Sequence, residues 1–390
     1  MNDAIADLYA DMVAWRHDLH AHPELGFNEH RTADFVAGKL AEFGVEVHRG
    51  IAGTGVVGTL RAGSGRRAIA FRADMDALPI AEKNDFAYAS TQPGVMHACG
   101  HDGHTSMLLG AARHLAAHRD FDGTVHFVFQ PAEENDGGGK RMVDEGLFER
   151  FPAENIFALH NWPGLAFGTL AVRVGPQMAA RDNFTIHVRG TGSHAAMPHL
   201  GDDPIVAACR IVADAQAIVS RTVDPLEAAV LSFTQIHGGN TMNVVPGEVT
   251  LAGTCRFLEA AVGAHVAERL ARLCRAVGED CDVKVALDYQ KGYPPAVNTA
   301  PAVATAAAAA RNAFGPDNVT TEFAPSMGSE DFAYMLQAQS GCYAWLGAGP
   351  ATPGKLLHQP NYDFNDALLP LGVRYFVSVV EAVLGKPSNR

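Results

Sequence analysis

The chain has 390 residues, of which 47% are hydrophobic and 19% charged, a composition typical of a folded protein that buries sizeable cores. At roughly 150 residues per domain, this length predicts two or three domains. The formal net charge of -13 makes nucleic acid and anionic membranes unfavourable partners, and no run of lysine and arginine offsets it.

The six cysteines are spread along the chain and form no CxxC pair. This pattern argues against a disulfide framework and favours a reducing, cytoplasmic location. The first residues have no apolar segment after a basic start, so they do not read as a signal peptide. No uninterrupted apolar stretch of about 18 residues exists, so no membrane span is expected.

In the first part of the chain, helices alternate with apolar strands. Residues 8–44 predict two amphipathic helices separated by HPELGFNE, and residues 45–60 predict a short hairpin. Three strands follow, in RRAIAFRADMDALP, TVHFVFQPAEE and ENIFALHNW, and CGHDGHTSMLLGAARHLAAH predicts a loop and a helix between the first two. Apolar strands that alternate with helices indicate the α/β class, with a mostly parallel sheet covered on both faces.

From about residue 182 the order changes to strand, helix, strand, strand, helix, strand. The helices span residues 202–221 and 261–278, and the strands are NFTIHVRG, AAVLSFTQI, NVVPGEVTLAGTCRF and DVKVALDYQ. This βαββαβ order is typical of a ferredoxin-like α+β fold. We therefore predict that residues 182–294 form a separate domain inserted into the first.

The last part of the chain returns to the first pattern. It predicts an alanine-rich helix at 299–314, a short helix near DFAYMLQ, a strand in CYAWLG and a final helix at 366–384. Residues 1–181 and 295–390 are therefore predicted to form one domain together.

Polar side chains follow the predicted parallel strands where each strand ends. Asp74 and Asp76 follow the first strand, Glu133 and Glu134 the second, and His160 ends the third. In open parallel sheets, ligands gather beyond the carboxyl ends of the strands. Taken one at a time, each residue has a structural explanation. Most adjacent glutamate pairs lie in solvent-exposed turns, and most histidines after apolar strands are core residues whose ring nitrogens have hydrogen-bond partners. Their coincidence indicates a site.

Two loops add further metal-ligating residue types. Cys99 and His101 lie two residues apart in HACGHDGH, whose glycines allow close backbone approach, and a late loop carries His358. Thiolate, imidazole and carboxylate together suit a borderline transition metal. The candidate ligands are Cys99, His101, Glu134, His160 and His358. Five ligands suit two ions that share a bridge, and one of the two adjacent glutamates is then free to take a proton from a metal-activated water.

Seven segments occur in a fixed order: FRADMDALPI, MHACGHDGHTSMLLGAA, FQPAEE, ALHNWPGL, GSHAAMPH, GSEDFAYM and LHQPNYDFND. This set resembles the M20 metallopeptidase family, in particular its amidohydrolase subfamily, which includes hippurate hydrolases, N-acyl-L-amino-acid amidohydrolases and auxin-conjugate hydrolases. The match runs from about residue 10 to the C-terminal helix. Where many M20 peptidases bridge their metals with an aspartate, this chain has Cys99, as in the amidohydrolase branch.

The resemblance implies that the five candidate ligands bind two divalent ions (zinc, manganese, cobalt or nickel), with Cys99 as the bridge. It makes Glu133 the general base and later the general acid towards the leaving amine, and it makes Asp76 a residue that orients a metal-bound imidazole. The residues 1–181 and 295–390 would form the catalytic metal-binding domain, and 182–294 the lid and dimerisation domain of a homodimer or higher homo-oligomer.

Three residues of the inserted domain are implied to act on the substrate. His194 of GSHAAMPH would help to stabilise the oxyanion, reaching across the dimer interface. Asn243 and Arg256 resemble lid positions that hold the substrate carboxylate.

The implied reaction is hydrolysis of the amide bond of N-acyl-L-amino acids, such as hippurate-like or N-acetyl amino acids. The same motifs also resemble carboxypeptidases, dipeptidases and N-acetyl-diaminopimelate deacetylases, and the sequence does not separate these. A metal-binding structural protein is a further alternative, although a closed structural site has no use for an unligated Glu133.

Overall fold

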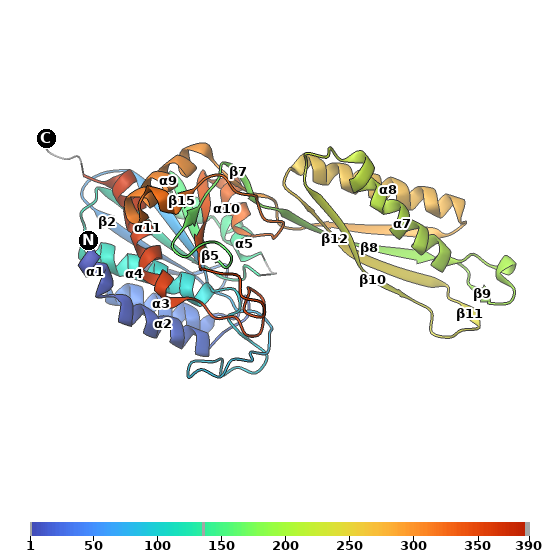
Figure 1. Ribbon diagram of the computed structural model, residues 1–390, viewed down its shortest axis with the longest axis horizontal. Coiled ribbons are helices and arrows are strands. Elements are labelled where there is room, and N and C mark those ends of the chain that lie inside the picture. The colour runs from blue at the N-terminus through green and yellow to red at the C-terminus, as the bar shows by residue number, and fades with distance from the viewer. Residues whose placement is uncertain (1, 135–136, 387–390) are drawn as a thin grey trace. The chain divides into compact units, whose positions relative to one another are not determined.

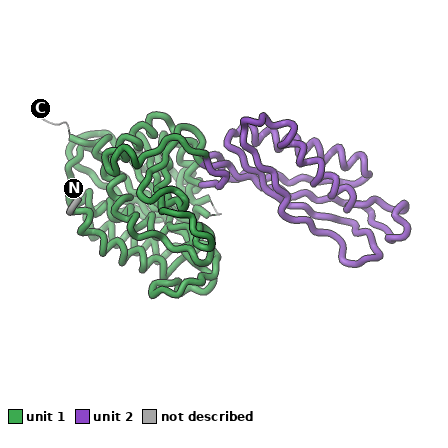
Figure 2. The backbone as a smooth tube through the Cα atoms, in the orientation of Figure 1, with its two compact units in different colours: residues 1–177, 296–324, 331–390 green, residues 178–295, 325–330 purple. Residues whose placement is uncertain are grey.

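The computed structural model describes residues 2–134 and 137–386 and divides the chain into two compact units (Figure 2). Unit 1 comprises Met1–Gln177, Ala296–Ala324 and Asp331–Arg390, and unit 2 comprises Met178–Pro295 and Pro325–Glu330. The short return of the chain at Pro325–Glu330 is not expected from the sequence. It is held to unit 2 by backbone contacts, because the N–H of Ala179 donates to the carbonyl of Ser326 at 3.0 Å.

Unit 1 is built on an eight-stranded sheet with the order β1-β2-β4-β3-β5-β16-β6-β15. Its strands are β1 (Glu46–Ile51), β2 (Gly55–Ala62), β3 (Ala68–Asp74), β4 (Gly123–Gln130), β5 (Asn155–Trp162), β6 (Leu170–Ala171), β15 (Val319–Thr320) and β16 (Gly341–Gly347). The central strands β4, β3, β5 and β16 run parallel, whereas β1 and β2 form the predicted antiparallel hairpin. The predicted α/β class with a largely parallel sheet is confirmed.

The central strands are buried on both faces because their side chains are almost continuously apolar. All seven residues of β16 are buried, and so are six of the seven residues of β3. The helices of unit 1 are α1 (Asn2–Ala6), α2 (Tyr9–Ala21), α3 (His30–Glu42), α4 (His101–Ala117), α5 (Gly138–Asp144), α6 (Leu147–Arg150), α9 (Ala300–Phe314), α10 (Phe332–Ala338) and α11 (Leu369–Leu384). Figure 1 shows these helices packed around the sheet, with α11 against both α4 and α9. A further two-stranded pair joins β7 (Gly175–Met178) to β14 (Ala296–Asn298).

The segment Asp366–Leu384, which ends in α11, is the single described segment long and apolar enough to cross a membrane. Of its apolar window, 67% is buried inside the protein. Val373, Phe376 and Val380 all belong to the core of unit 1. The apolar character of α11 is therefore that of a core helix.

Unit 2 has a four-stranded antiparallel sheet in the order β10-β12-β8-β13. Its strands are β8 (Ala180–Arg189), β10 (Ala229–Gly238), β12 (Glu248–Phe257) and β13 (Lys284–Lys291), with a short β9 (Ser193–His194) and β11 (Val244–Val245), and its helices are α7 (Pro204–Thr222) and α8 (Ala260–Asp280). Alternate residues of β12 are buried, because one face of the sheet packs against the helices. The chain order and strand order are those of the predicted ferredoxin-like arrangement.

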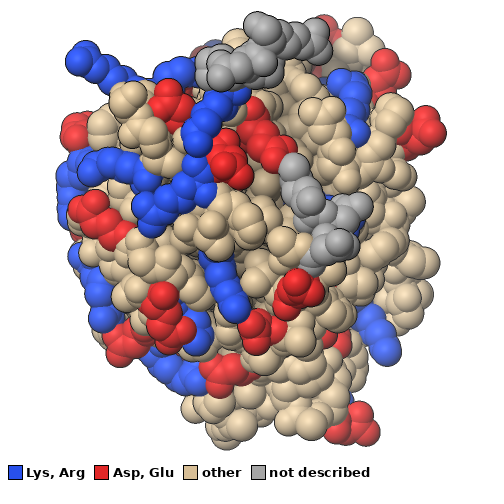
Figure 3. All heavy atoms as spheres, turned by 90° about the vertical axis from the view of Figure 1, so that its left-hand side faces the viewer, with Lys and Arg blue, Asp and Glu red and all other residues tan. Residues whose placement is uncertain are grey.

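The charged side chains do not segregate by sign on the face that Figure 3 shows. Lysine and arginine are interspersed there with aspartate and glutamate. The acidic excess of the chain is therefore not concentrated on this face.

Candidate metal centre

The candidate ligands gather where parallel strands end. Asp74 at the end of β3 is in register with Gln130 at the end of β4, so the Glu133–Glu134 turn leaves the sheet beside Asp74. Arg72 of β3 pairs with Ala158 of β5, which brings His160, two residues further on, to the same edge. Parallel strands present their carboxyl ends at one edge, and the sequence-distant polar residues meet for that reason.

Several groups of three side chains place possible ligand atoms within 4.8 Å of one another, and two of these groups share Cys99. One group is Cys99, His101 and His160, and the other is Cys99, Glu134 and His358. The Sγ of Cys99 lies 3.4 Å from Nε2 of His160, and Oε1 of Glu134 lies 3.4 Å from Nε2 of His358. The structure thus brings all five predicted ligands together, and Cys99 is common to both groups.

The donor set fits divalent cations. Nε2 of His101 and Oε1 of Glu134 are 3.8 Å apart, and both are buried with no hydrogen-bond partner among the residues that the structure describes. Leaving two buried polar atoms unsatisfied is costly, and a cation bound by both would satisfy them. Thiolate, imidazole and carboxylate ligands suit borderline transition metals such as zinc.

Asp76 orients two of these ligands. Nδ1 of His101 donates to the backbone carbonyl of Asp76 at 2.8 Å and lies 3.2 Å from the Asp76 carboxylate. Because a carbonyl only accepts, Nδ1 carries a proton, and Nε2 is the ring nitrogen that would bind a metal. The other carboxylate oxygen of Asp76 accepts the backbone N–H of Glu134 at 3.0 Å.

The electrostatics of the two buried imidazoles differ. Burial lowers the pKa of His160 well below its usual value, and the neighbouring His104 lowers it further, so His160 is neutral as a ligand must be. Burial also lowers the pKa of His101, but Asp74, Asp76 and Glu134 outweigh burial and raise it to about 10. The negative charges of these carboxylates stabilise a proton on His101, and the same charges would stabilise a metal cation bound to its Nε2.

Glu133 lies beside the ligand groups but outside the two that share Cys99. Its side chain is 7% exposed, and its Oε1 accepts the backbone N–H of Asp331 at 3.3 Å. Ala132 directly before it has a φ of 53°, a left-handed conformation that is unusual for alanine. The buried Glu29 stabilises this turn, because its carboxylate accepts the N–H of Ala132 at 2.8 Å.

Gly100 confirms the predicted close approach of the backbone in HACGHDGH. Its φ is 95°, and a Cβ atom there would lie 2.3 Å from Oδ1 of Asn161 and 2.8 Å from the hydroxyl of Tyr362. Only glycine avoids both the strain and the overlap. Cys99 and His101 are placed on either side of this residue.

A buried polar network beneath the ligands was not predicted. His104 lies 2.6 Å from Asp74 and 2.8 Å from Asn161, and Arg72 donates to Asp74 at 2.6 Å. Asp331 accepts from Gly139 at 2.7 Å and from Arg72 at 3.3 Å. Asp74 and His104 could have been found from their positions, at a strand end and in a histidine-rich segment. No sequence pattern points to the partners of Asp331.

The three predicted residues of unit 2 do not lie together. His194 on β9 is paired in register with Val244, the neighbour of Asn243, and both His194 and Asn243 are exposed. Arg256 is half-buried and donates to the hydroxyl of Thr254 at 2.6 Å. It lies eight residues along β12 from Glu248, a rise of about 26 Å.

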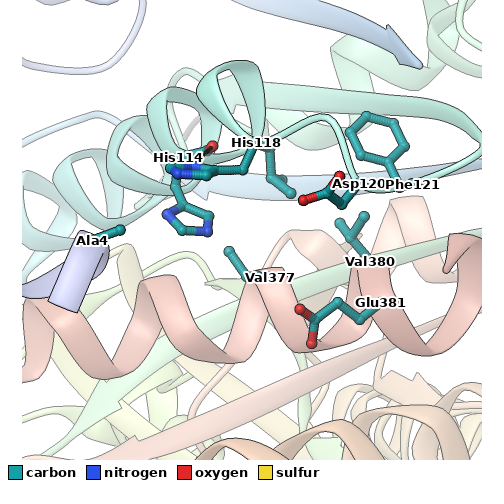
Figure 4. A pocket seen from close by; sticks show the side chains of 9 residues that line it. Ala4, His114, His118, Asp120, Phe121, Val377, Val380 and Glu381 are labelled. Atoms are coloured by element: carbon teal, nitrogen blue, oxygen red, sulfur yellow. Dashed lines mark hydrogen bonds between the residues drawn. The ribbon is translucent and has the colours of Figure 1, made fainter. Parts of the chain in front are cut away.

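The cavity shown in Figure 4 is separate from the strand-end cluster. It has a volume of about 230 Å³, and His114, His118, Asp120 and Glu381 line it together with apolar side chains. His114 follows His101 by thirteen residues of α4, which corresponds to roughly 20 Å along the helix. This cavity therefore contributes nothing to the candidate metal centre.

Comparison with known proteins decides the family. The model of peptidase family M20/M25/M40 matches residues 70–382. The chain belongs to this family. The predicted membership is confirmed, and the M20 match covers every strand-end residue described above.

Two curated M20 relatives and one solved structure illustrate the similarity. The hippurate hydrolase of Campylobacter jejuni is 38% identical over 96% of this chain and 97% of its own. The N-acyl-L-amino acid amidohydrolase of Geobacillus stearothermophilus is 43% identical over 75% of this chain and 80% of its own. A Bacillus subtilis structure described as a dinuclear metal-binding M20 peptidase is 30% identical, with a TM-score of 0.84 over 97% of this chain and 99% of that one.

Proposed function

We propose that this M20 hydrolase is a metal-dependent amidohydrolase that cleaves the amide bond of N-acyl-L-amino acids. The observation that carries the proposal is the pair of overlapping ligand groups that share Cys99, with the carboxylate of Glu133 beside them, within 4.8 Å of ligand atoms of His101 and Glu134. The names of the two curated relatives, a hippurate hydrolase and an N-acyl-L-amino acid amidohydrolase, support this substrate class.

Five residues would hold two divalent ions, and Cys99 belongs to both of the ligand groups described above: Cys99, His101, Glu134, His160 and His358. When bound, the ions supply Lewis-acid activation of a water and of the scissile carbonyl. Asp76 fixes the tautomer of His101 through the carbonyl and carboxylate contacts described above. Zinc, manganese, cobalt and nickel all suit this mixed ligand set.

Glu133 is assigned the proton transfers. Its carboxylate takes a proton from the attacking water, and the same proton passes to the nitrogen of the leaving amine as the C–N bond breaks. The products are the free carboxylate of the acyl group and the free amino acid. The backbone N–H of Asp331 donates to one oxygen of Glu133, which supports a fixed position for this carboxylate.

Unit 2 is assigned the binding of substrate and the function of a dimerisation lid. His194 would donate a hydrogen bond to the carbonyl oxygen as negative charge develops there. Asn243 and Arg256 would contact the substrate carboxylate. Arg256 pairs with Arg181, close to where the chain passes into unit 2, whereas His194 and Asn243 lie at the other end of the sheet. This separation favours their supply by different copies of the chain in a homodimer.

A cytoplasmic location completes the proposal. All six cysteines are free thiols, and Cys99 must stay reduced to act as a metal ligand.

A substrate panel tests the function. We expect the metal-loaded protein to release free amino acid from N-benzoyl- and N-acetyl-L-amino acids that carry a free α-carboxylate. Amides that lack the carboxylate should be poor substrates. Activity confined to unmodified dipeptides or to C-terminal residues of peptides would overturn the proposal in favour of a peptidase.

A further inference from the structure

A second polar cavity lies in unit 1, on the side of the sheet formed by β1, β2 and β4. Its volume is about 260 Å³, and its charged and imidazole lining residues are Glu46, His48, Arg61, Arg66, His126 and Arg150. His126 lies within the apolar strand TVHFVFQ, where the sequence alone predicts a core histidine with a hydrogen-bond partner. The structure shows that His126 also lines this cavity.

The cavity is remote from the candidate metal centre. Ala68 and Thr124, the partners at the start of β3 and close to the start of β4, line it. The metal centre lies beyond Asp74 and Gln130, six residues further along the same strands. At about 3.3 Å per residue, the two sites are roughly 20 Å apart, so the cavity has no part in the proposed hydrolysis.

The charges that line the cavity are unbalanced. Three guanidinium groups face one carboxylate, that of Glu46, and Glu46 is already paired with His48 at 3.1 Å and Arg61 at 3.8 Å. Arg66 and Arg150 form no ion pair with the part of the chain that the structure describes. Arg150 interacts electrostatically with Glu145 without forming an ion pair with it. The lining therefore carries an excess of positive charge at one concave site, in a chain whose net charge is -13.

The floor of the cavity is buried and made of side chains that contact one another. His126 is 3% exposed and its Nδ1 lies 3.0 Å from the hydroxyl of Thr59 on the neighbouring strand. Burial lowers the pKa of His126 to about 4, so the ring is neutral near pH 7. The buried ring of Phe151 packs against His48 with ring centroids 4.9 Å apart, and the guanidinium of Arg150 lies 5.4 Å from the same ring.

We propose that this cavity binds a small, multiply charged anion through a phosphate or pyrophosphate group. Arginine guanidinium groups match phosphate oxygens in a planar, two-point geometry, and charge-assisted hydrogen bonds of this kind are the strong ones. The volume of the cavity is larger than the volume that several water molecules occupy in the liquid, at about 30 Å³ each. The cavity therefore has room for a phosphate group. The shared chemistry is the phosphate group, which an inorganic anion and a phosphorylated metabolite both offer.

Calorimetric titration of the metal-loaded protein tests the proposal. The probes are inorganic phosphate, pyrophosphate and adenosine monophosphate, and the proteins are wild type, the double variant Arg66→Gln/Arg150→Gln and the control Arg275→Gln. Arg275 is an exposed residue of α8 and matches the charge change without lining the cavity. We expect each lost guanidinium to weaken binding by about tenfold, with the control unchanged.

The outcomes separate the sources of the anion. Tighter binding of adenosine monophosphate than of phosphate, lost in the double variant, identifies a phosphorylated metabolite. Tighter binding of pyrophosphate, equally lost, identifies an inorganic anion. Binding that the double variant leaves unchanged belongs to the metals and overturns the proposal, as does a lack of binding at millimolar concentration. Amidase activity and unfolding temperature should be the same in all three proteins, because both arginines are exposed and remote from the metal centre.

Discussion

The strand-end cluster of unit 1 and the predicted lid residues of unit 2 differ in how they are held. In the cluster, a second contact fixes most of the side chains, as Asp76 fixes His101 and the backbone of Asp331 fixes Glu133. In unit 2, His194 and Asn243 are exposed. Their polar contacts are local, such as the N–H of Ala196 that donates to His194 at 3.1 Å.

The difference indicates two stages of organisation. Most of the cluster is preorganised within one chain, because Cys99, His101 and His160 are buried and Glu134 is half-buried, whereas the fifth ligand, His358, is exposed. The predicted lid residues lack such supports, and we expect them to act only when a substrate or a partner subunit meets them. Substitutions in the cluster should therefore change metal binding and chemistry, whereas those in the lid should change catalysis without changing metal content.

The largest effect is expected from loss of metal. Chelation should lower activity by about 10⁴-fold or more, because metals supply several kcal/mol of transition-state stabilisation, and divalent ions should restore it. Cys99→Ala should lower both the metal content, measured by elemental analysis, and the activity. Cys209→Ala, at an exposed position, is the matched control. Unchanged metal stoichiometry and activity in Cys99→Ala would remove the basis for a shared bridging ligand.

The next effect separates the adjacent glutamates. Glu133→Gln should keep its metal and lose about 10²–10⁴-fold in kcat, because the amide cannot accept the proton from water. Glu134→Gln should instead lose metal affinity, since Glu134 contacts the ligands His101 and His358. Metal content and kcat, measured on both variants, show which glutamate binds metal and which transfers the proton. If both variants lose metal equally, the roles given to the two glutamates are wrong.

A smaller effect is expected in the lid. His194→Ala should lower kcat by about 10²–10³-fold with full metal content, because one hydrogen-bond donor to the oxyanion is lost. The control is His237→Ala, another exposed histidine of unit 2.

Mixing experiments extend this test to the dimer. Inactive Glu133→Ala subunits and inactive His194→Ala subunits should regain activity when they exchange, because one site of a mixed dimer has both native residues. Subunits that demonstrably exchange and stay inactive would show that His194 does not act across an interface.

The smallest effect concerns stability near the start of α4. His20 lies 2.8 Å from Asp102 and 3.2 Å from Glu82. Burial lowers the pKa of His20, but hydrogen bonds to Asp102 and Glu82 outweigh burial and raise it to about 9 from 6.5. A raised pKa in the folded state stabilises the protein below pH 6.5, and that contribution is lost as the pH rises through 9.

Urea unfolding at pH 6 and pH 9.5 measures this contribution. The free energy of unfolding of the wild type should fall by on the order of 2–3 kcal/mol more than that of His20→Gln. His126→Gln should show the opposite sign, because burial lowers the pKa of His126 to about 4 in the fold while the unfolded group titrates near 6.5. The free energy of unfolding of this variant should fall by about 0.8 kcal/mol more than that of the wild type over the same pH interval. An identical slope in wild type and His20→Gln would show that His20 is not charged in the fold.

The sequence by itself determined the elements and most of the site. Apolar periodicity predicted the hairpin, the parallel strands and the split βαβ order, because these signals are local and repeat every two or 3.6 residues. The strand-end rule brought Glu134 and His160 to one edge because parallel strands end together. The glycine of HACGHDGH likewise indicated a close backbone approach before its partners, Asn161 and Tyr362, were known.

Only the tertiary structure decided which distant residues support the site. Asp331 meets Glu133 and Arg72 from nearly 200 and 259 residues away, and no local pattern encodes such a pairing. The return of Pro325–Glu330 to unit 2 rests on backbone hydrogen bonds. The periodicity of side chains along the sequence does not predict such bonds. Arg66 and Arg150 share a cavity for the same reason, because their approach depends on how the sheet and its connections pack and not on any spacing in the chain.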